Sequence, residues 1–504
     1  MKNWPLYLLS LSVLLCKPVF ADYTYREDDV RTVDGVLYDV SGEPITGTYE
    51  DFYDDNNLKS QMQYVDGVLN GVAVMYNEQG YKEADMPFVD GKLNGIAFSY
   101  YENGQMKERI PYRHGKVHGT MRAYYPDGAI KMRASYENDM KTGETRDFYE
   151  NGKVREVATY VYDVKNGPAQ VYYPDGRLAE EYDYVDGKIS GEKKVYYRTG
   201  ELKSDVQYVD GKKNGLQRQY FEDGEIESIV NYRDDMADGE GFFYDENGKI
   251  KLSVNYKNNM RDGIARSYFP NGTVKLAVTY AKDVRNGVET AYYESGYVKS
   301  EKPFLKGETT GVGREYYENG MIKSEVTYER SVANGPARYY DENGKVQTDV
   351  MYKDGVREGL QTEYDANGVK VAEGMYVNDV LEGEYREFYA DGKVKSVANY
   401  ENDKLEGLTL IYDTEGNLSY EVPYVNGKKE GTMKRYYPTG EVMGEVIYEK
   451  GMKHGMLDAY NEDGTLMAKV LFNKDKAIKG YSMDHGRSPV PMKDEELKLI
   501  NEGY

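Results

Sequence analysis

The sequence has very little cysteine, tryptophan and histidine: one Cys, one Trp and four His among 504 residues. With one cysteine the chain forms no internal disulfide bond and offers no thiolate cluster for a zinc site. After the first residues, no apolar run is long enough to cross a bilayer as a helix. The formal net charge of −22 repels phosphate backbones, which argues against a nucleic-acid-binding function.

Glycine and tyrosine are abundant instead, with 53 Gly and 54 Tyr. This composition favours strands and tight turns over helices. Hydrophobic residues make up 39% of the chain, which together with the glycines argues against wholesale disorder. Length alone would predict three or four average domains.

The first 21 residues have the features of a secretory signal peptide. Lys2 gives a positive start, residues 6–15 form a short apolar run, and the VFA tripeptide ending at Ala21 resembles a cleavage site. The run is too short to span a bilayer, and an uncleaved anchor is the alternative interpretation. Cleavage would remove Cys16 and two lysines, taking the net charge from −22 to −24. We therefore expect an exported protein, either periplasmic, outer-envelope associated or secreted, without disulfide bonds.

A glycine recurs every 24 residues along most of the chain, without insertion or deletion. This period indicates one array of eighteen repeats rather than several independent domains, and each repeat is numbered here from its glycine as position 0. The glycines of position 0 are Gly47, Gly71, Gly95, Gly119, Gly143, Gly167, Gly191, Gly215, Gly239, Gly263, Gly287, Gly311, Gly335, Gly359, Gly383, Gly407, Gly431 and Gly455.

Four further positions of the repeat are nearly constant. Positions 5 and 17 are aromatic in all eighteen repeats, and position 9 is glycine in all but one, where Asn56 stands. Position 20 is Gly, Asp or Asn everywhere except at Ser331. Because Gly, Asn and Asp tolerate a positive φ, positions 9 and 20 predict two tight turns per repeat.

The residues between the turns alternate in character. Positions 11 and 15 are mostly aliphatic and position 17 is aromatic, whereas positions 12, 14 and 16 are mainly polar or charged. This is the period of a strand with one buried face. We expect strands over positions 1 to 6 and 11 to 17, in an all-β, elongated single array of antiparallel β-hairpins (a meander) of about eighteen 24-residue units. Each repeat would contact mainly its neighbours.

The pattern divides the chain into a signal peptide (residues 1–21), an N-terminal capping segment (22–46), the repeat array (47–478) and a C-terminal part (479–504). The C-terminal part is expected to contain a cap, a linker at 488–491 and a short helical tail. Leu497 and Ile500 would share one face of this tail helix. The tail could dock on a neighbour, cap the last strand or fray, and fraying is the favoured interpretation.

The run G-x-x-x-x-Y-Y-x-[D/N]-G, followed by an aliphatic-Lys pair and a Y-x-[D/N]-G turn, resembles the MORN repeat, above all its bacterial hairpin variant. Residues 95–106 (GIAFSYYENGQM) and 208–215 (YVDGKKNG) are good examples, and the resemblance covers about Gly35 to Lys476. It implies an extended sheet used for protein contacts or assembly, sometimes for lipid contact, with no shared catalytic motif. Many bacterial relatives carry an antitoxin label, which fits an export signal poorly and stays a weaker alternative. Aspartate replaces the aromatic of position 6 at Asp245, Asp341, Asp365 and Asp413.

The sequence gives little support for catalytic chemistry or a metal site. His114, His118 and His454 stand in turns at positions 19 or 23, and His485 lies near the C-terminus, so we expect turn residues facing water. A zinc site would need further ligands. The acidic turns match no calcium-loop signature, and the glycines open no phosphate-binding helix. We expect no enzyme activity, no cofactor and no metal.

Position 6 supplies the candidate binding residues. It is aromatic in twelve repeats, and strand alternation would put its side chains opposite position 5, in a ladder with steps of about 10 Å. In the favoured hypothesis the rings pack over the adjacent turn and complete the hairpin. In the other hypothesis they form an exposed stripe that binds a partner. The candidate binding residues are Tyr101, Tyr125, Tyr149, Tyr173, Tyr197, Phe221, Phe269, Tyr293 and Tyr317.

Position 3 is Arg or Lys in nine repeats. These cations share a strand face with the aromatic of position 5, so we expect them to stack over its ring. A cationic groove for acidic ligands is the alternative. The nine residues are Arg122, Arg146, Lys194, Arg218, Arg266, Arg314, Arg338, Arg386 and Lys434.

These patterns together predict a non-enzymatic repeat scaffold that binds a protein partner through an extended, aromatic-rich sheet. The alternative is a cell-envelope module that binds lipid or polysaccharide. Rows of tyrosine suit stacking on sugars, whereas the negative charge disfavours anionic membranes. We expect no nucleic-acid partner and no transmembrane segment after signal cleavage.

Overall fold

The computed structural model describes residues 23–484 and 488–502. The predicted signal peptide, Cys16 and His485 lie outside the described residues. The described chain is almost entirely strand and turn, with one short 3-10 helix, η1 (Glu27–Asp29), and one α-helix, α1 (Asp494–Glu502). The predicted all-β, antiparallel hairpin-repeat class is therefore confirmed.

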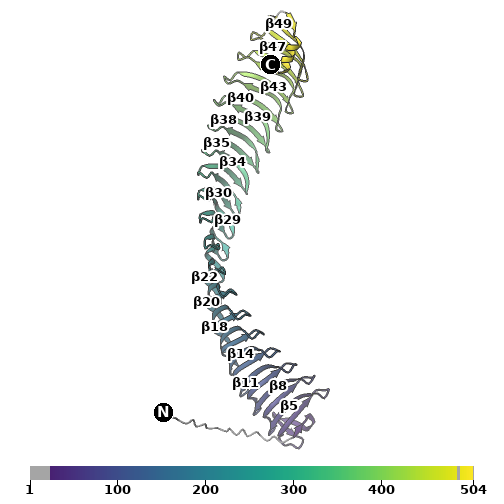
Figure 1. Cartoon of the computed structure of the whole chain (residues 1–504), viewed down its shortest axis with the longest axis vertical. Helices are drawn as coiled ribbons and strands as arrows, with labels where there is room; N and C mark the ends of the chain where they lie inside the picture. The colour runs from purple at the N-terminus through teal and green to yellow at the C-terminus, as the bar shows by residue number, and fades with distance from the viewer. Residues whose placement is uncertain (1–22, 485–487, 503–504) are drawn as a thin grey trace, which may run out of the picture. The chain divides into compact units, whose positions relative to one another are not determined.

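The chain forms two compact bodies. The N-terminal body comprises the residues up to Gly239 together with Glu246–Gly248, and the C-terminal body comprises Glu240–Asp245 and the residues from Lys249 onward. Within each body, consecutive hairpins follow one another in chain order, and neighbouring strands of the repeats run antiparallel (Figure 1).

The N-terminal body contains the first strands of the chain. Their bounds are β1 (Thr24–Tyr25), β2 (Val30–Val33), β3 (Val36–Asp39), β4 (Gly47–Phe52), β5 (Leu58–Val65), β6 (Val68–Leu69), β7 (Gly71–Tyr76), β8 (Lys82–Val89), β9 (Lys92–Leu93), β10 (Gly95–Tyr100), β11 (Met106–Arg113), β12 (Lys116–Val117), β13 (Gly119–Tyr124), β14 (Ile130–Glu137), β15 (Met140–Lys141), β16 (Gly143–Phe148), β17 (Val154–Val161), β18 (Val164–Tyr172), β19 (Leu178–Val185), β20 (Lys188–Tyr196), β21 (Leu202–Val209), β22 (Lys212–Tyr220) and β23 (Ile226–Arg233).

Strand β24 (Met236–Tyr244) includes the boundary between the bodies, and the C-terminal body holds the remaining strands. Their bounds are β25 (Ile250–Lys257), β26 (Met260–Arg261), β27 (Gly263–Tyr268), β28 (Val274–Ala281), β29 (Val284–Tyr292), β30 (Val298–Leu305), β31 (Glu308–Thr309), β32 (Gly311–Tyr316), β33 (Ile322–Glu329), β34 (Val332–Tyr340), β35 (Val346–Lys353), β36 (Val356–Arg357), β37 (Gly359–Tyr364), β38 (Lys370–Val377), β39 (Val380–Phe388), β40 (Val394–Glu401), β41 (Lys404–Leu405), β42 (Gly407–Tyr412), β43 (Leu418–Val425), β44 (Lys428–Lys429), β45 (Gly431–Tyr436), β46 (Val442–Glu449), β47 (Met452–Tyr460), β48 (Leu466–Asn473), β49 (Lys476–Asp484) and β50 (Ser488–Pro491).

One repeat is a hairpin whose register is the same along the chain. In the repeat from Gly143, position 0 pairs with Tyr160 at position 17, and Thr145 at position 2 pairs with Ala158 at position 15. A bulge between Asp147 and Phe148 shifts the register, and the first strand stops at Phe148, which pairs with Val154. The expected strand over positions 1 to 6 is therefore one residue too long, because position 6 already belongs to the turn.

The two predicted turns are present. Position 9 has a positive φ, as in Gly128 (90°), and so do positions 19 and 20, as in Asn138 (51°) and Asp139 (75°). The second turn requires a positive φ at position 19 even where Tyr162 or Arg330 stands there, and neither residue type favours it. The repeat register therefore overrides local preference at position 19.

The register gives each hairpin two faces. Face A carries positions 2, 13, 15 and 17, and it buries small and aliphatic side chains such as Ala158, Ala169 and Val254 beside the aromatic rings of position 17. Face B carries positions 1, 3, 5, 14 and 16, which are more polar and more exposed. Because one sheet layer makes only a thin core, the contacts of a repeat lie within its own hairpin and with its direct neighbours.

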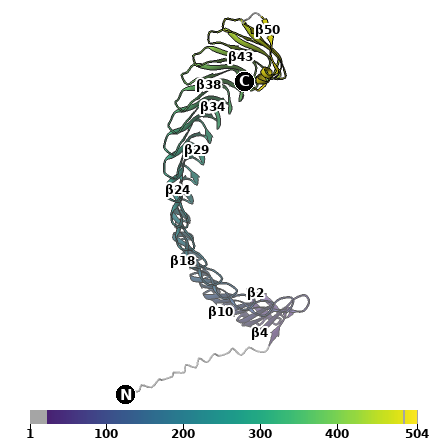
Figure 2. The same cartoon turned by 45° about the horizontal axis from the view of Figure 1, so that its top comes forward.

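Both ends of the described chain cover the array. At the N-terminal end, β1 pairs in parallel with β4, and Leu37 of β3 donates its N–H to the carbonyl of Gly67 at 2.8 Å. At the C-terminal end, the expected linker at 488–491 is wrong, since these residues form β50 and pair with β49. The expected fraying is also wrong: Leu497 and Ile500 of α1 pack against a buried cluster, as the helix beside the last strands in Figure 2 illustrates.

Candidate functional site

The tyrosines of position 6 tie each first turn to the next repeat. The hydroxyl of Tyr101 donates to the carbonyl oxygen of Tyr124 at 2.8 Å, and Tyr149 does the same to Tyr172 at 2.7 Å. Every tyrosine at position 6 makes this bond to position 5 of the following repeat, over 2.7–2.9 Å. The complete set is Tyr53, Tyr101, Tyr125, Tyr149, Tyr173, Tyr197, Tyr293, Tyr317, Tyr389 and Tyr437.

The rings of this tyrosine ladder are half-buried. In several repeats the lysine of position 12 lies beside the ring, with 5.7 Å from the Lys131 ammonium to the centroid of Tyr125 and 5.4 Å from Lys203 to Tyr197. The aromatic ring and the lysine thus cover the turn together.

All nine candidate residues occupy this same place in their repeats, and seven of them make the hydroxyl bond; Phe221 and Phe269 have no hydroxyl to donate. Their geometry agrees with the packing role favoured above. Binding of a partner by these rings stays a prediction.

Aspartate at position 6 closes the turn in a different way. Oδ1 of Asp341 accepts the N–H groups of Asn343 at 2.9 Å and Lys345 at 2.8 Å, and thus caps its own turn. Asp365 and Asp413 do the same. These backbone hydrogen bonds hold the pKa of all three carboxyls below the usual range, because they stabilise the charged form.

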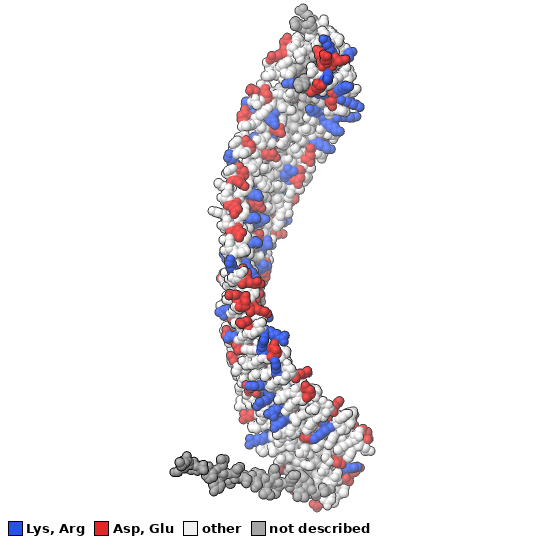
Figure 3. Space-filling model, in the orientation of Figure 1, with Lys and Arg blue, Asp and Glu red and all other residues white. Residues whose placement is uncertain are grey.

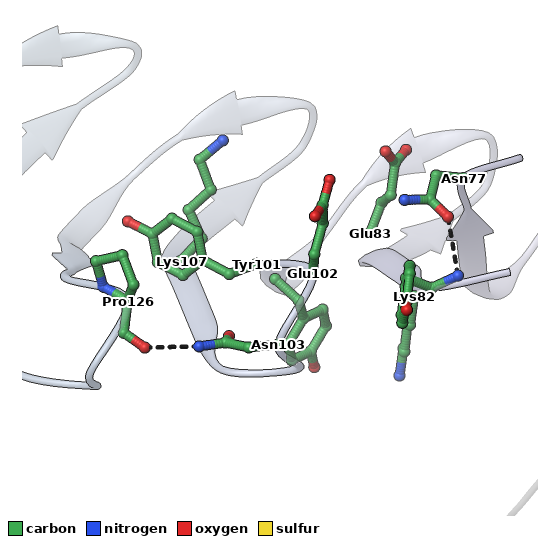
Figure 4. Close-up of a pocket in the computed structure, with 10 residues that line it drawn as sticks. Asn77, Lys82, Glu83, Tyr101, Glu102, Asn103, Lys107 and Pro126 are labelled. Atoms are coloured by element: carbon green, nitrogen blue, oxygen red, sulfur yellow. Dashed lines mark hydrogen bonds between the residues drawn. The ribbon is translucent and has the colours of Figure 1, made fainter. Parts of the chain in front are cut away.

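The repeat from Gly71 has no aromatic ring at position 6 and leaves a hollow beside its first turn. Asn77 stands at position 6, and its Oδ1 accepts the N–H of Tyr81 at 2.9 Å. Beside it lies an open hollow of about 450 Å³ lined by Tyr101 of the next repeat and by Lys107, among others. Figure 4 shows the carboxylates of Glu83 and Glu102 next to each other and Lys107 beside Tyr101.

The cations of position 3 form ion pairs on face B. Arg218 lies 3.0 Å from Asp205, and Arg314 lies 2.9 Å from Glu325, where both carboxylates are at position 14. The predicted stacking of position 3 over the position-5 ring is thus wrong for these residues. The position-5 hydroxyl joins the same carboxylate, as Tyr220 donates to Asp205 at 2.7 Å.

These hydrogen-bonded tyrosines resist ionisation. Burial, followed by the bond to Asp205, raises the pKa of Tyr220 to about 12. Burial and the bond to Glu301 raise the pKa of Tyr316 to about 12 in the same way. Six of the nine cations at position 3 form ion pairs with carboxylates: Arg146, Lys194, Arg218, Arg314, Arg338 and Arg386. On the face that Figure 3 shows, basic and acidic side chains are interspersed in both bodies.

Face B of the C-terminal body also carries a row of exposed apolar side chains, which sequence reasoning missed. Position 1 is apolar in five consecutive repeats, with Val288 at 48% and Leu360 at 46% exposure, and Met375 pairs with Leu360 across the hairpin. A hollow of about 300 Å³ lies between Val312 and Pro336. The run of apolar residues at position 1 was the available sequence signal. The apolar row consists of Ile264, Val288, Val312, Pro336, Leu360, Met351 and Met375.

The remaining candidate chemistry finds no site in the described residues. His114 lies in a turn and is exposed, His118 is half-buried between β12 and β13, and His454 lies within β47, so the expected turn position is wrong for His454. The three described histidines belong to no group of three His, Cys, Asp or Glu side chains able to hold a metal ion. Among residues 23–484 and 488–502, no helix has the length and apolar character needed to span a membrane.

The repeats match a family model described as the MORN repeat variant, over more than half of the chain. No curated protein matches the chain. The matched segments are residues 45–66, 93–114, 117–138, 141–162, 165–186, 189–210, 213–234, 237–258, 261–282, 309–330, 333–354, 357–378, 381–402, 405–426 and 429–450.

Among solved structures, the chain is similar to the crystal structures of TcdB2-TccC3-Cdc42 and of TcdB2-TccC3, at 11% identity in both cases. The alignments cover 88% and 90% of this chain but only 28% and 30% of those chains. The chain therefore spans less than a third of their length. With a TM-score of 0.13 in both, the similarity carries no argument about fold or function.

Proposed function

The chain belongs to the MORN repeat variant family, and from this premise we propose that it is an exported, non-enzymatic repeat scaffold that binds a protein partner through side chains of its sheet. The family is a class of repeats without a catalytic role. Uniform repeats support a scaffold, because they present the same positions at regular intervals along each body.

The apolar row on face B is the observation that carries protein binding. Five consecutive repeats expose an aliphatic residue or proline at position 1, where Thr or Glu stands in many other repeats. Contiguous exposed apolar surface marks interaction sites on soluble proteins. Arg314 and Arg338, which flank the row, are paired with Glu325 and Asp349, so in these repeats the apolar side chains are bordered by ion pairs.

Charge insertion into the row tests this function. The variant Val288→Glu/Val312→Glu/Leu360→Glu should fold, because Glu144 and Glu384 occupy position 1 in other repeats of the same chain. A photo-crosslinker at Val312 in the native cells would identify the bound protein. The purified partner should then lose at least tenfold in affinity for the triple variant.

The matched control is Thr120→Glu/Thr432→Glu, which adds charge at position 1 outside the row and should bind normally. Equal binding of the partner by wild type and the triple variant would contradict the role of the row. A Tyr→Phe series at position 6, measured with the same partner, would show whether the candidate residues take part.

Export is part of the proposal and rests on the signal-like residues 1–21. We expect the mature protein to start at Asp22, as N-terminal sequencing of the purified protein would show. An intact N-terminus in the cytoplasmic fraction would contradict export.

A second candidate function, polysaccharide binding, is favoured by the hollow beside Asn77. Tyr81 is 51% exposed and lines the hollow together with amide, carboxylate and ammonium groups. An exposed aromatic ring beside several hydrogen-bonding groups suits the binding of a neutral sugar. The variant Asn77→Tyr should restore the tyrosine ladder and fill the hollow. If the hollow binds sugar, saturation-transfer signals from envelope oligosaccharides should be present with wild type and absent with this variant; no signal with wild type would contradict it.

A further inference from the structure

Face A of the C-terminal body has an open groove next to the place where α1 docks. The groove has a volume of about 380 Å³ and crosses the repeats from Gly407, Gly431 and Gly455. It exists because Gly444 stands at position 13 and Ala459 at position 4, so neither residue fills the space. Its apolar lining includes Tyr420, Met433, Val446, Tyr448 and Leu457.

The adjoining part of the same face already binds a helix. Leu497 and Ile500 of α1 pack against Val470, Phe472 and Ala477, and Leu457 joins that cluster. Leu457 also lines the open groove. Leu457 therefore contacts the surface that binds α1 and also lines the open groove, so the α1-binding surface and the groove form one continuous apolar surface.

Basic groups border the groove. The guanidinium of Arg435 lies 5.6 Å from the ring centroid of Tyr420, and the ammonium of Lys429 lies 5.1 Å from that of Tyr448. Lys453 lines the groove as well. The one carboxylate of the lining, Glu445, accepts the hydroxyl of Tyr460. The groove therefore favours an occupant with acidic groups beside its apolar side.

We propose that this groove binds an amphipathic α-helix of a partner protein, with aliphatic residues at i and i+3 or i+4 and acidic residues beside them. The helix α1 shows the same chemistry, with Leu497 and Ile500 on one side and Asp494, Glu495 and Glu496 in its first turn. The inference rests on the proposed protein-binding function, but it uses the face opposite to the apolar row.

A synthetic peptide of residues 490–504 (VPMKDEELKLINEGY) is a suitable probe, added to the full chain with isotope-labelled methionine methyl groups. The expected result is a saturable shift of the Met433, Met443 and Met467 signals, since these residues line the groove. A peptide with Asp at the positions of Leu497 and Ile500 should give no shift, and this control leaves the protein unchanged.

Reversal of the charge of the basic groove residues is the second test of the inference. Arg435→Glu/Lys453→Glu should weaken peptide binding at least tenfold. The matched control is Lys213→Glu, at the same repeat position as Lys453 and likewise beside an aromatic ring, 4.9 Å from the centroid of Tyr232. This control should leave binding unchanged.

Three outcomes would overturn the inference. The first is that the signals of the groove methionines do not shift. The second is that only the Met492 signal shifts, which would report displacement of the chain's own α1. A dimer that is lost when Leu497 and Ile500 are replaced by Asp in the chain is the third, since it assigns the groove to a second copy. Partner binding by the apolar row is measured separately. If the groove does not bind the peptide but the row still binds its partner, the inference about the groove is wrong and the proposed function still holds.

Discussion

The repeats from Gly95 to Gly215 and those from Gly335 to Gly407 close the same turn with different side chains. In the first region, position 6 is aromatic throughout, and tyrosines such as Tyr149 bond to the following repeat. In the second region, three of four repeats have aspartate there, and residues such as Asp365 bond only within their own turn.

The backbone of the turn is the same in both regions. Tyr149 donates its N–H to Lys153 at 2.8 Å, and Asp365 donates to Val369 at 2.9 Å. The difference between the regions therefore lies in the side chain alone. The turn at Asp365 forms without a hydrogen bond from its position-6 side chain to the next repeat. The tyrosine hydroxyl therefore contributes to coupling between repeats rather than to the shape of the turn.

The largest effect is expected when four rings of the ladder are removed. The variant Tyr125→Ser/Tyr149→Ser/Tyr173→Ser/Tyr197→Ser loses a hydrogen bond and half-buried aromatic area at each site, together about 2 kcal/mol per site. Denaturant unfolding should show this loss.

The matched control is Asp341→Ser/Asp365→Ser/Asp413→Ser, because serine can still accept an N–H in the turn. This control should change stability little. If the four tyrosine substitutions left the free energy of unfolding unchanged but abolished partner binding, the rings would form a binding stripe, and their hydrogen bonds to the next repeat would not matter for stability.

A smaller effect should follow from removal of the hydroxyls alone. Phenylalanine at Tyr125, Tyr149, Tyr173 and Tyr197 keeps the ring and loses one hydrogen bond per site, at about 1 kcal/mol each. Phe221 and Phe269 show that phenylalanine is accommodated at this position. Thermal unfolding with a transition resolved for each body should show the change in the N-terminal body; equal loss in both bodies would contradict the local tie.

Acid should distinguish the second region. Because the folded-state pKa of Asp341, Asp365 and Asp413 lies below the usual value, these carboxylates stabilise their turns fully above about pH 4. This contribution is lost as the pH falls through the lowered pKa. Hydrogen exchange at the turn amides should rise over that range in wild type, whereas the Asp→Asn triple variant should lack the acid-dependent part.

The smallest change in stability is expected from converting one turn into the other type. Asp365→Tyr removes two bonds within the turn and adds one to the carbonyl of Phe388, so stability should change by less than about 1 kcal/mol. Hydrogen–deuterium exchange should nonetheless show greater protection in the following repeat, from Gly383. Unchanged protection there would contradict transfer of the tie.

Much of the fold could be predicted from the sequence, because the period of 24, the aromatic positions and the turn residues repeat without interruption. Position 6 was only partly predictable. Its ring was expected to complete the turn. Its hydroxyl, however, donates to a backbone carbonyl, and because every residue has such a carbonyl, the acceptor could not be identified from the sequence. The second turn also escaped full prediction, since the Asp139 side chain accepts the N–H of Val117 from the preceding repeat at 2.7 Å.

The C-terminal end was mispredicted for a related reason. The apolar face of Leu497 and Ile500 was visible in the sequence, but its partner surface is made by Val470 and Phe472, which look like ordinary repeat positions. The apolar row was also missed: five consecutive apolar residues at position 1 were visible in the sequence, but the pattern alone does not show that their side chains are exposed.

The most direct test of the central claim is native-state hydrogen exchange on two single variants, Tyr149→Phe and Asp365→Ala. If the tyrosine hydroxyl couples neighbouring repeats, Tyr149→Phe should raise exchange both in its own turn and in the next repeat, from Gly167. Asp365→Ala should raise exchange only at its own turn, residues 365–369. Changes confined to the altered turn in both variants would contradict the account.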